Sequence, residues 1–237
     1  MSENPADHLP RPDASAAVEH LGWRLLLGAY QASVPVASSE SGLAVAQAVV
    51  AACGADADTH LRVDLRPRRV ELALQAAGSE RVTRRDVELA EAVAQAVTDA
   101  GFTIGAPTGD RPAQILEIAI DALDIPAIRP FWAAVLDYVD EPMTADVGAA
   151  AIVDPVGQGP AVWFQQLDEP RRQRNRIHFD ITVAHDEADR RIRAALDAGG
   201  VLVSDAAARA FWILADVEGN EICVCTWQDR DSRIERG

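Results

Sequence analysis

The chain contains no lysine, so all 22 of its basic residues are arginines. Enzymes that form a Schiff base, proteins that anchor pyridoxal phosphate and phosphate-binding loops of the GK[ST] kind all need a lysine, and these classes are excluded. The sequence also lacks an uncharged apolar run of about 18 residues, the length that a membrane helix needs. Residues 1–14 have neither the basic nor the apolar region of a secretory signal. We therefore expect a cytoplasmic protein.

Cysteine is also scarce, with three residues at Cys53, Cys223 and Cys225. The number is odd, and a disulfide framework needs pairs. Cys223 and Cys225 are separated by one residue on an expected strand, and we expect their side chains on opposite faces of it. The sequence therefore predicts free thiols.

The net charge is −15 and the isoelectric point is near 4.6. Binding to nucleic acid or to an anionic membrane needs a basic face, so neither partner is expected. Hydrophobic residues make up 49% of the chain, which is enough for packed cores. The composition favours a globular protein whose partner is a small molecule.

The N-terminal half shows an α+β pattern. We expect a helix from Ser39 to Cys53, two strands at residues 60–65 and 69–75, and a helix that starts with a capping box at Thr83 and Asp86 and ends at Gly101. Pro, Asp, Ser and Ala dominate residues 1–17, and Gly and Pro recur in residues 105–112. The predicted organisation is a flexible leader at residues 1–17, a domain at 18–104, a linker at 105–112, a second domain at 113–230 and a tail at 231–237.

The second domain contains two similar halves, residues 115–166 and 176–226. Each is readable as a strand, a helix and then three strands. Asp124 is a suitable N-cap for the first helix, with Pro126 in its first turn, and Gly199 ends the second helix. The fold class predicted for the whole chain is α+β, with a paired βαβββ arrangement at the C-terminus.

These paired modules, with Phe131-Trp132, the run Asn-Arg-Ile-His-Phe-Asp at residues 175–180 and Glu-Gly-Asn-Glu at residues 218–221, resemble the glyoxalase-like branch of the vicinal oxygen chelate superfamily. The resemblance implies two modules that curl around one central pocket. It also implies chemistry on a small molecule, in many members with a divalent metal.

A second resemblance covers residues 58–65 and 82–90, which look like the pterin-4a-carbinolamine dehydratase family. In that family a His-His-Pro-Asp run and a later histidine transfer protons. Here the run reads Thr59-His60-Leu61-Arg62, and residues 75–81 contain no histidine. His60 is therefore either a residual dehydratase-like group or a strand-edge histidine without function, and the first domain is expected to be structural or dimerising.

The glyoxalase-like resemblance implies a metal held by Glu117, His178 and Cys223, with Glu117 and His178 as the catalytic residues. The metal expected is zinc, iron, nickel or manganese, since a thiolate favours zinc or iron over magnesium. Glu117 interrupts an apolar strand, where an unpaired carboxylate costs free energy. A register shift by one residue would instead turn Glu117 outward, and Cys223 could be a small buried apolar residue.

Ligand contacts are expected from Trp132, Gln165, Asp180 and Arg176. Asp180 follows His178 by two positions, so its carboxylate can orient the imidazole from the same strand face. Arg176 ends an arginine-rich segment, residues 171–176, that could attract an anionic substrate or could be a solvated loop.

Three functions remain open on the sequence. The first is a glyoxalase-like protein that binds a small molecule in the C-terminal pocket and converts it as a lyase, isomerase or oxygenase-like catalyst. The second is a binding protein without catalysis, which the incomplete ligand set favours. The third is a 4a-hydroxytetrahydrobiopterin dehydratase with an altered active site. Both families commonly associate, so a homodimer is expected.

Overall fold

The computed structural model describes residues 8–79, 81–105, 113–141, 151–170 and 177–229. The chain divides into two compact units, Met1–Ile115 and Leu116–Gly237, and each is described by itself. No helix within the described residues combines the length and the apolar character needed to cross a membrane.

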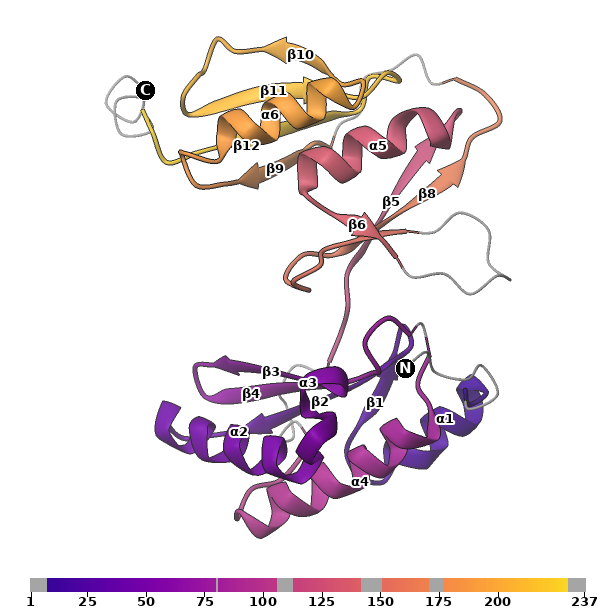
Figure 1. Ribbon diagram of the computed structural model, residues 1–237, viewed down its shortest axis with the longest axis vertical. Helices are drawn as coiled ribbons and strands as arrows, with labels where there is room; N and C mark the ends of the chain where they lie inside the picture. Colours follow the sequence, from indigo (N-terminus) through magenta and orange to yellow (C-terminus); the bar gives the residue numbers. More distant parts are fainter. Residues whose placement is uncertain (1–7, 80, 106–112, 142–150, 171–176, 230–237) are drawn as a thin grey trace. The chain divides into compact units, whose positions relative to one another are not determined.

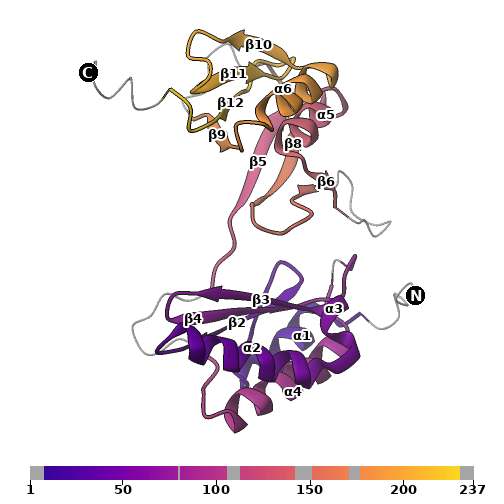
Figure 2. The same cartoon turned by 60° about the vertical axis from the view of Figure 1, so that its left-hand side comes forward.

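The first unit is a four-stranded antiparallel sheet with the order β1-β2-β4-β3. Figure 1 and Figure 2 show helices α1, α2 and α4 on one face of this sheet. The elements are α1 (Arg11–Glu19), β1 (Arg24–Leu26), β2 (Ala29–Pro35), α2 (Ser39–Cys53), η2 (Gly54–Asp56), α3 (Ala57–His60), β3 (Leu61–Arg66), β4 (Arg69–Leu74) and α4 (Arg84–Asp99). The core lies between the sheet and the helices, because alternate strand residues such as Val70, Leu72 and Leu74 point inward.

Local signals in this unit are confirmed by the structure. Helix α4 begins with the predicted capping box, in which Thr83 and Asp86 each accept a backbone hydrogen bond from the other. Helix α2 spans the expected residues, and its N-cap is Ser38. The turn between β3 and β4 comprises Pro67 and Arg68.

The expectation of a flexible leader is wrong for residues 11–17. These residues belong to α1, whose Ala14 and Val18 are buried in the core of the first unit. The hydroxyl of Tyr30 also donates a hydrogen bond to the carbonyl of Ala14 at 3.0 Å. The polar composition concealed the helix because only a few small apolar residues, Ala14, Ala17 and Val18, pack against the core.

The second unit contains the two βαβββ modules predicted from the sequence, so the mixed α+β class is confirmed. The first module consists of β5 (Glu117–Ala122), α5 (Ile125–Leu136), β6 (Val139–Asp140), β7 (Ile152–Val153) and β8 (Ala161–Gln166). The second consists of β9 (Phe179–Thr182), α6 (Ala188–Asp197), β10 (Val201–Ser204), β11 (Phe211–Ala215) and β12 (Glu221–Cys225). Three strands after the helix were expected in the first module, but the position of β6 was not predicted from the sequence.

Each module forms its own four-stranded sheet, with the orders β5-β8-β7-β6 and β10-β11-β12-β9. The first and last strands of a module are parallel neighbours, β5 with β8 and β9 with β12, and the remaining pairs are antiparallel. Side chains that face outward from these parallel pairs are therefore brought together although about 40 residues separate them in sequence.

One hydrophobic core serves both modules. Helices α5 and α6 pack against each other, as Figure 2 shows, and the core includes Phe131 and Trp132 from α5 and Leu214 and Ile222 from the second sheet. Asp124 caps α5 by accepting from the backbone N–H of Ala127, as predicted.

All three cysteines are free. The expectation that Cys223 and Cys225 face opposite ways is wrong, because side chains two positions apart on a strand share a face. Their parallel partners on β9 are Asp180 and Thr182, respectively.

Candidate functional site

Polar side chains of the second module gather where β9 begins beside β12. Phe179 and Ile181 pack against the core, so the alternating residues His178 and Asp180 point to the opposite face. Both side chains are more than half exposed, at 55% and 58%. The strand pair therefore presents an imidazole and a carboxylate on an accessible face of the sheet.

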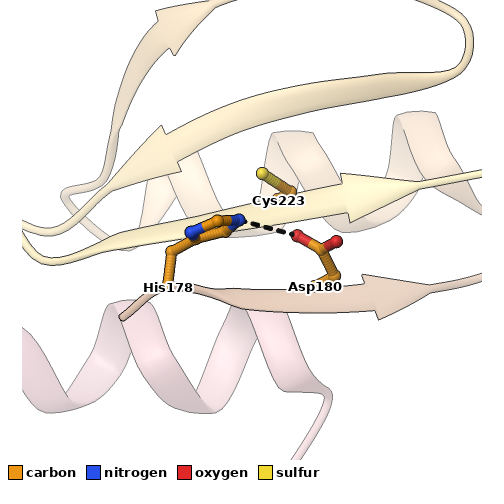
Figure 3. A group of neighbouring side chains, drawn as sticks. All are labelled: His178, Asp180 and Cys223. Carbon is orange, nitrogen blue, oxygen red and sulfur yellow. Dashed lines mark ion pairs between the residues drawn. The ribbon is translucent and has the colours of Figure 1, made fainter. Parts of the chain in front are cut away.

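His178, Asp180 and Cys223 form a cluster on this face, shown in Figure 3. One potential ligand atom of each side chain lies within 4.8 Å of those of the other two. Nε2 of His178 is 3.6 Å from Oδ1 of Asp180, and Cys223 reaches the cluster because the strand register places it opposite Asp180. Parallel pairing of β9 and β12 therefore assembles one nitrogen, one oxygen and one sulfur donor.

The thiol of Cys223 is the most perturbed group of the cluster. Burial, followed by the hydrogen bond and the charge of Asp180, raises its pKa to about 12. Cys223 is therefore a neutral thiol at neutral pH, and a metal ion would have to displace its proton to bind the sulfur.

The donor set fits a divalent metal. Imidazole, carboxylate and thiolate are all ligands of zinc, and three protein ligands leave a position open for water or substrate, as in catalytic zinc sites. The exposure of His178 and Asp180 gives an ion access to two of the three donors. Magnesium fits less well, because it prefers oxygen ligands.

Glu117, which the sequence assigned to the same centre, lies elsewhere in the second unit. It is the first residue of β5, it is exposed, and it is not a member of the cluster. Gln165 is also exposed, on β8, opposite Asp121 of β5. Both residues belong to the first module.

The two modules have equivalent positions that the strand register identifies. Strand β8 begins two residues after Gly159 and β12 begins two residues after Gly219, so Trp163 and Cys223 are the third residues of corresponding strands. Trp163 lies opposite Ala119, and Cys223 lies opposite Asp180. By the same count, Glu117 is the counterpart of His178, and among the described residues the donor cluster is found in the second module.

Trp132, which the sequence proposed as a ligand contact, is 1% exposed. Its indole donates to Oδ2 of Asp216 at 2.9 Å, and its ring packs edge-on against Phe131 and Phe179. Trp132 therefore has a structural role in the core of the second unit. Arg176 and the rest of the arginine-rich segment lie outside the described residues.

In the first unit, Nδ1 of His60 is 2.9 Å from Oδ1 of the fully buried Asp86. His8 is a second imidazole of this unit and was not predicted to belong to a site. Its Nε2 is 3.4 Å from Oγ of Ser79. The position of His8 is hard to predict from the sequence, because the residue precedes the first helix and pairs with Thr83 through a single β-bridge.

Comparison with known proteins identifies the second unit. Residues 117–225 match the family model described as "Glyoxalase-like domain". The second unit therefore contains a glyoxalase-like domain, as the resemblance of its paired modules implied. The match covers less than half of the chain, and the dehydratase-like resemblance of the first unit stays a prediction.

Solved structures with distant similarity include fosfomycin resistance proteins. The protein from Mesorhizobium loti is 12% identical, with 53% of this chain and 100% of that chain covered and a TM-score of 0.40. The protein from Listeria monocytogenes is 9% identical, with 52% and 98% covered and a TM-score of 0.39. A structure described as a possible glyoxalase from Bacillus cereus is 14% identical, with 48% and 99% covered and a TM-score of 0.38. Such similarity is too distant to assign an activity. No curated protein matches the chain.

Proposed function

We propose that the glyoxalase-like domain binds a small molecule at the outward face of its two sheets, with one divalent metal ion held by His178, Asp180 and Cys223. The observation that carries the proposal is the meeting of three different donor atoms within 4.8 Å on an accessible strand pair. Such mixed N, O and S sets suit zinc, iron or nickel better than magnesium.

A metal in this position would polarise an oxygen atom of the bound molecule and stabilise negative charge that develops on it. The protein groups around it would orient that molecule. Oδ1 of Asp180 lies 3.6 Å from Nε2 of His178, so its carboxylate would help to orient the imidazole. The reaction classes consistent with this arrangement are those of a lyase, an isomerase or an oxygenase-like catalyst, and Glu117 and Gln165 are the proposed ligand contacts of the first module.

The proposal differs from the sequence expectation in one ligand. Asp180 takes the place of Glu117, because Asp180 lies beside Cys223 while Glu117 is outside the cluster. A non-catalytic binding protein is the alternative within the same fold, since ligand binding at this face requires no turnover.

Metal binding is the direct test. Protein stripped of metal and then incubated with zinc, iron, nickel or manganese should retain close to one ion per chain by elemental analysis. His178→Ala and Cys223→Ser should each lower the affinity for zinc by at least about tenfold, since each removes one of three ligands. Absence of any retained metal in the wild type would contradict the metal centre and favour the binding protein.

Two matched variants control for this experiment. His185→Ala removes an imidazole of the same unit that contacts Trp227 instead of the cluster. Cys225→Ser removes a thiol from the same strand as Cys223 but outside the cluster. Both should bind zinc as the wild type does. Equal loss in His185→Ala and His178→Ala would indicate a general effect on folding and count against the proposed ligands.

A second candidate function is proton transfer on a pterin carbinolamine by the first unit. The hydrogen-bonding distance between His60 and the buried Asp86 supports it, because a carboxylate can fix the orientation of a catalytic imidazole. The proposal is tested by turnover of 4a-hydroxytetrahydrobiopterin. Activity that His60→Gln abolishes would support it, and absence of turnover in the wild type would eliminate it.

A further inference from the structure

The two modules of the second unit present different chemistry at equivalent positions. The second module places a nitrogen, an oxygen and a sulfur donor together, whereas the first carries a carboxylate, a methyl group and an indole. The equivalent pairs are His178 with Glu117, Asp180 with Ala119, and Cys223 with Trp163. The first module therefore offers one carboxylate and an aromatic ring where the second offers a metal-binding set.

Trp163 is the aromatic residue that faces outward here. It is 37% exposed, whereas its sequence neighbour Phe164 is 3% exposed and packs in the core. The residue opposite it on β5 is Ala119, and the residue two positions earlier on its own strand and face is Ala161. These two neighbours are small, whereas Gln165 is the residue two positions later on the same strand and face.

The indole N–H of Trp163 also differs from those of three other tryptophans. The indoles of Trp23, Trp132 and Trp227 donate to Ala90, Asp216 and His185, respectively. No residue within the described parts of the chain accepts a hydrogen bond from Trp163. A partly exposed tryptophan whose indole N–H has no hydrogen-bond partner among the described residues can contact a ligand.

Carboxylates lie on both sides of Trp163 on the neighbouring strand. Glu117 and Asp121 are the outward-facing residues two positions before and after Ala119, so both are diagonal neighbours of the indole. Asp121 is half-buried and already has an interaction partner, whereas Glu117 is exposed and has no ion pair with a described residue. An aromatic face beside an exposed carboxylate attracts a cation and repels an anion.

We propose that the outward face of the first module, through Trp163 and Glu117, binds small molecules that carry an ammonium group. The inference rests on the proposed function of the second unit as a small-molecule-binding domain, and it names the chemical class of that molecule. The ammonium group lies on the indole face and pairs with the Glu117 carboxylate. The charge of −15 on the chain adds a long-range attraction for such cations.

Choline is a suitable probe, because 3,3-dimethyl-1-butanol has the same shape without the charge. Choline should shift the Trp163 indole signal in an NMR titration, and 3,3-dimethyl-1-butanol should bind at least about fivefold more weakly, as expected from the loss of a cation–π contact of about 1 kcal/mol. Trp163→Leu and Glu117→Gln should each weaken choline binding at least fivefold, and Trp163→Phe should restore most of it. Equal binding of the two probes would overturn the proposal.

Trp227→Leu is the matched control, since Trp227 is 65% exposed but lies just after β12, away from β5 and β8 in sequence. This variant should bind choline as the wild type does. Unchanged choline affinity in Trp163→Leu, preferential binding of benzoate, or no choline binding at all would each refute the inference.

Zinc retention separates this inference from the metal centre. Trp163→Leu should retain as much metal as the wild type but bind choline more weakly. Choline binding through Trp163 without metal retention would support the inference and would contradict only the proposed metal centre. Metal retention without choline binding would support the metal centre and contradict the inference.

Discussion

The indole of Trp132 donates a hydrogen bond of 2.9 Å to the carboxylate of Asp216, 84 residues later in the chain. Asp216 is 2% exposed and also accepts from the backbone N–H groups of Glu218 and Asn220. The Glu218 carboxylate in turn accepts from the backbone N–H of Asp124 at 2.7 Å. The loop between β11 and β12 is thereby fixed to the start of α5, so the segment at residues 216–220 joins the two modules.

Asp216→Ala should destabilise the second unit by about 2–4 kcal/mol, because the buried indole N–H and the loop N–H groups lose their acceptor. The midpoint of urea unfolding, followed by tryptophan fluorescence, measures the change. Asp205→Ala, at an exposed position in the same unit, should change the free energy of unfolding by less than about 0.5 kcal/mol. Equal effects of the two substitutions would contradict a structural role for the Trp132 contact.

Gly200→Ala and Gly42→Ala should have opposite signs. A Cβ at Gly200 would lie 2.3 Å from the ring of Phe131 and 2.8 Å from the carbonyl of Ala195, so we expect a loss of about 1–3 kcal/mol. A Cβ at Gly42 in α2 would approach no atom closer than 3.4 Å, and alanine favours the helix by up to about 1 kcal/mol. Thermal unfolding of each variant tests both, and destabilisation by Gly42→Ala would contradict the packing around α2.

Thr83→Ala should destabilise the first unit by about 1–2 kcal/mol, because it removes the N-cap of α4. Thr98→Ala is the matched change in the same helix. The Thr98 side chain is exposed and bonds only to the carbonyl of Ala94, so its replacement should lie within about 0.5 kcal/mol of the wild type. Hydrogen exchange of the α4 amides would show whether the loss at Thr83 is confined to the start of the helix.

Both tyrosines of the chain should resist ionisation in the folded protein. Burial, with a smaller contribution from Asp86, raises the pKa of Tyr30 from 10.0 to about 12, and burial also raises the pKa of Tyr138. A raised pKa means that the stabilisation is complete below pH 10.0 and is lost as the pH rises through about 12. Tyrosinate absorbance should therefore appear only with alkaline unfolding seen by circular dichroism. Half-ionisation at pH 10.0 in a folded protein would contradict the burial.

Local sequence signals were sufficient for much of the fold. The capping box at Thr83, the Asp124 cap and the alternation in β3 and β4 depend on neighbours within a few residues, and their elements formed as predicted. Helix α1 was missed because its two buried residues, Ala14 and Val18, are recognisable only when the sheet against which they pack is present.

The sequence by itself determined the paired βαβββ pattern and the shared strand face of His178 and Asp180, because both follow from the periodicity of single elements. Tertiary structure decided which residues meet. The parallel register of β9 and β12 placed Cys223 beside Asp180, and the register of β5 and β8 left Glu117 with Trp163 in the other module. These contacts join residues about 40 positions apart, and a one-residue change in register would exchange the faces of either strand, which no local pattern can specify.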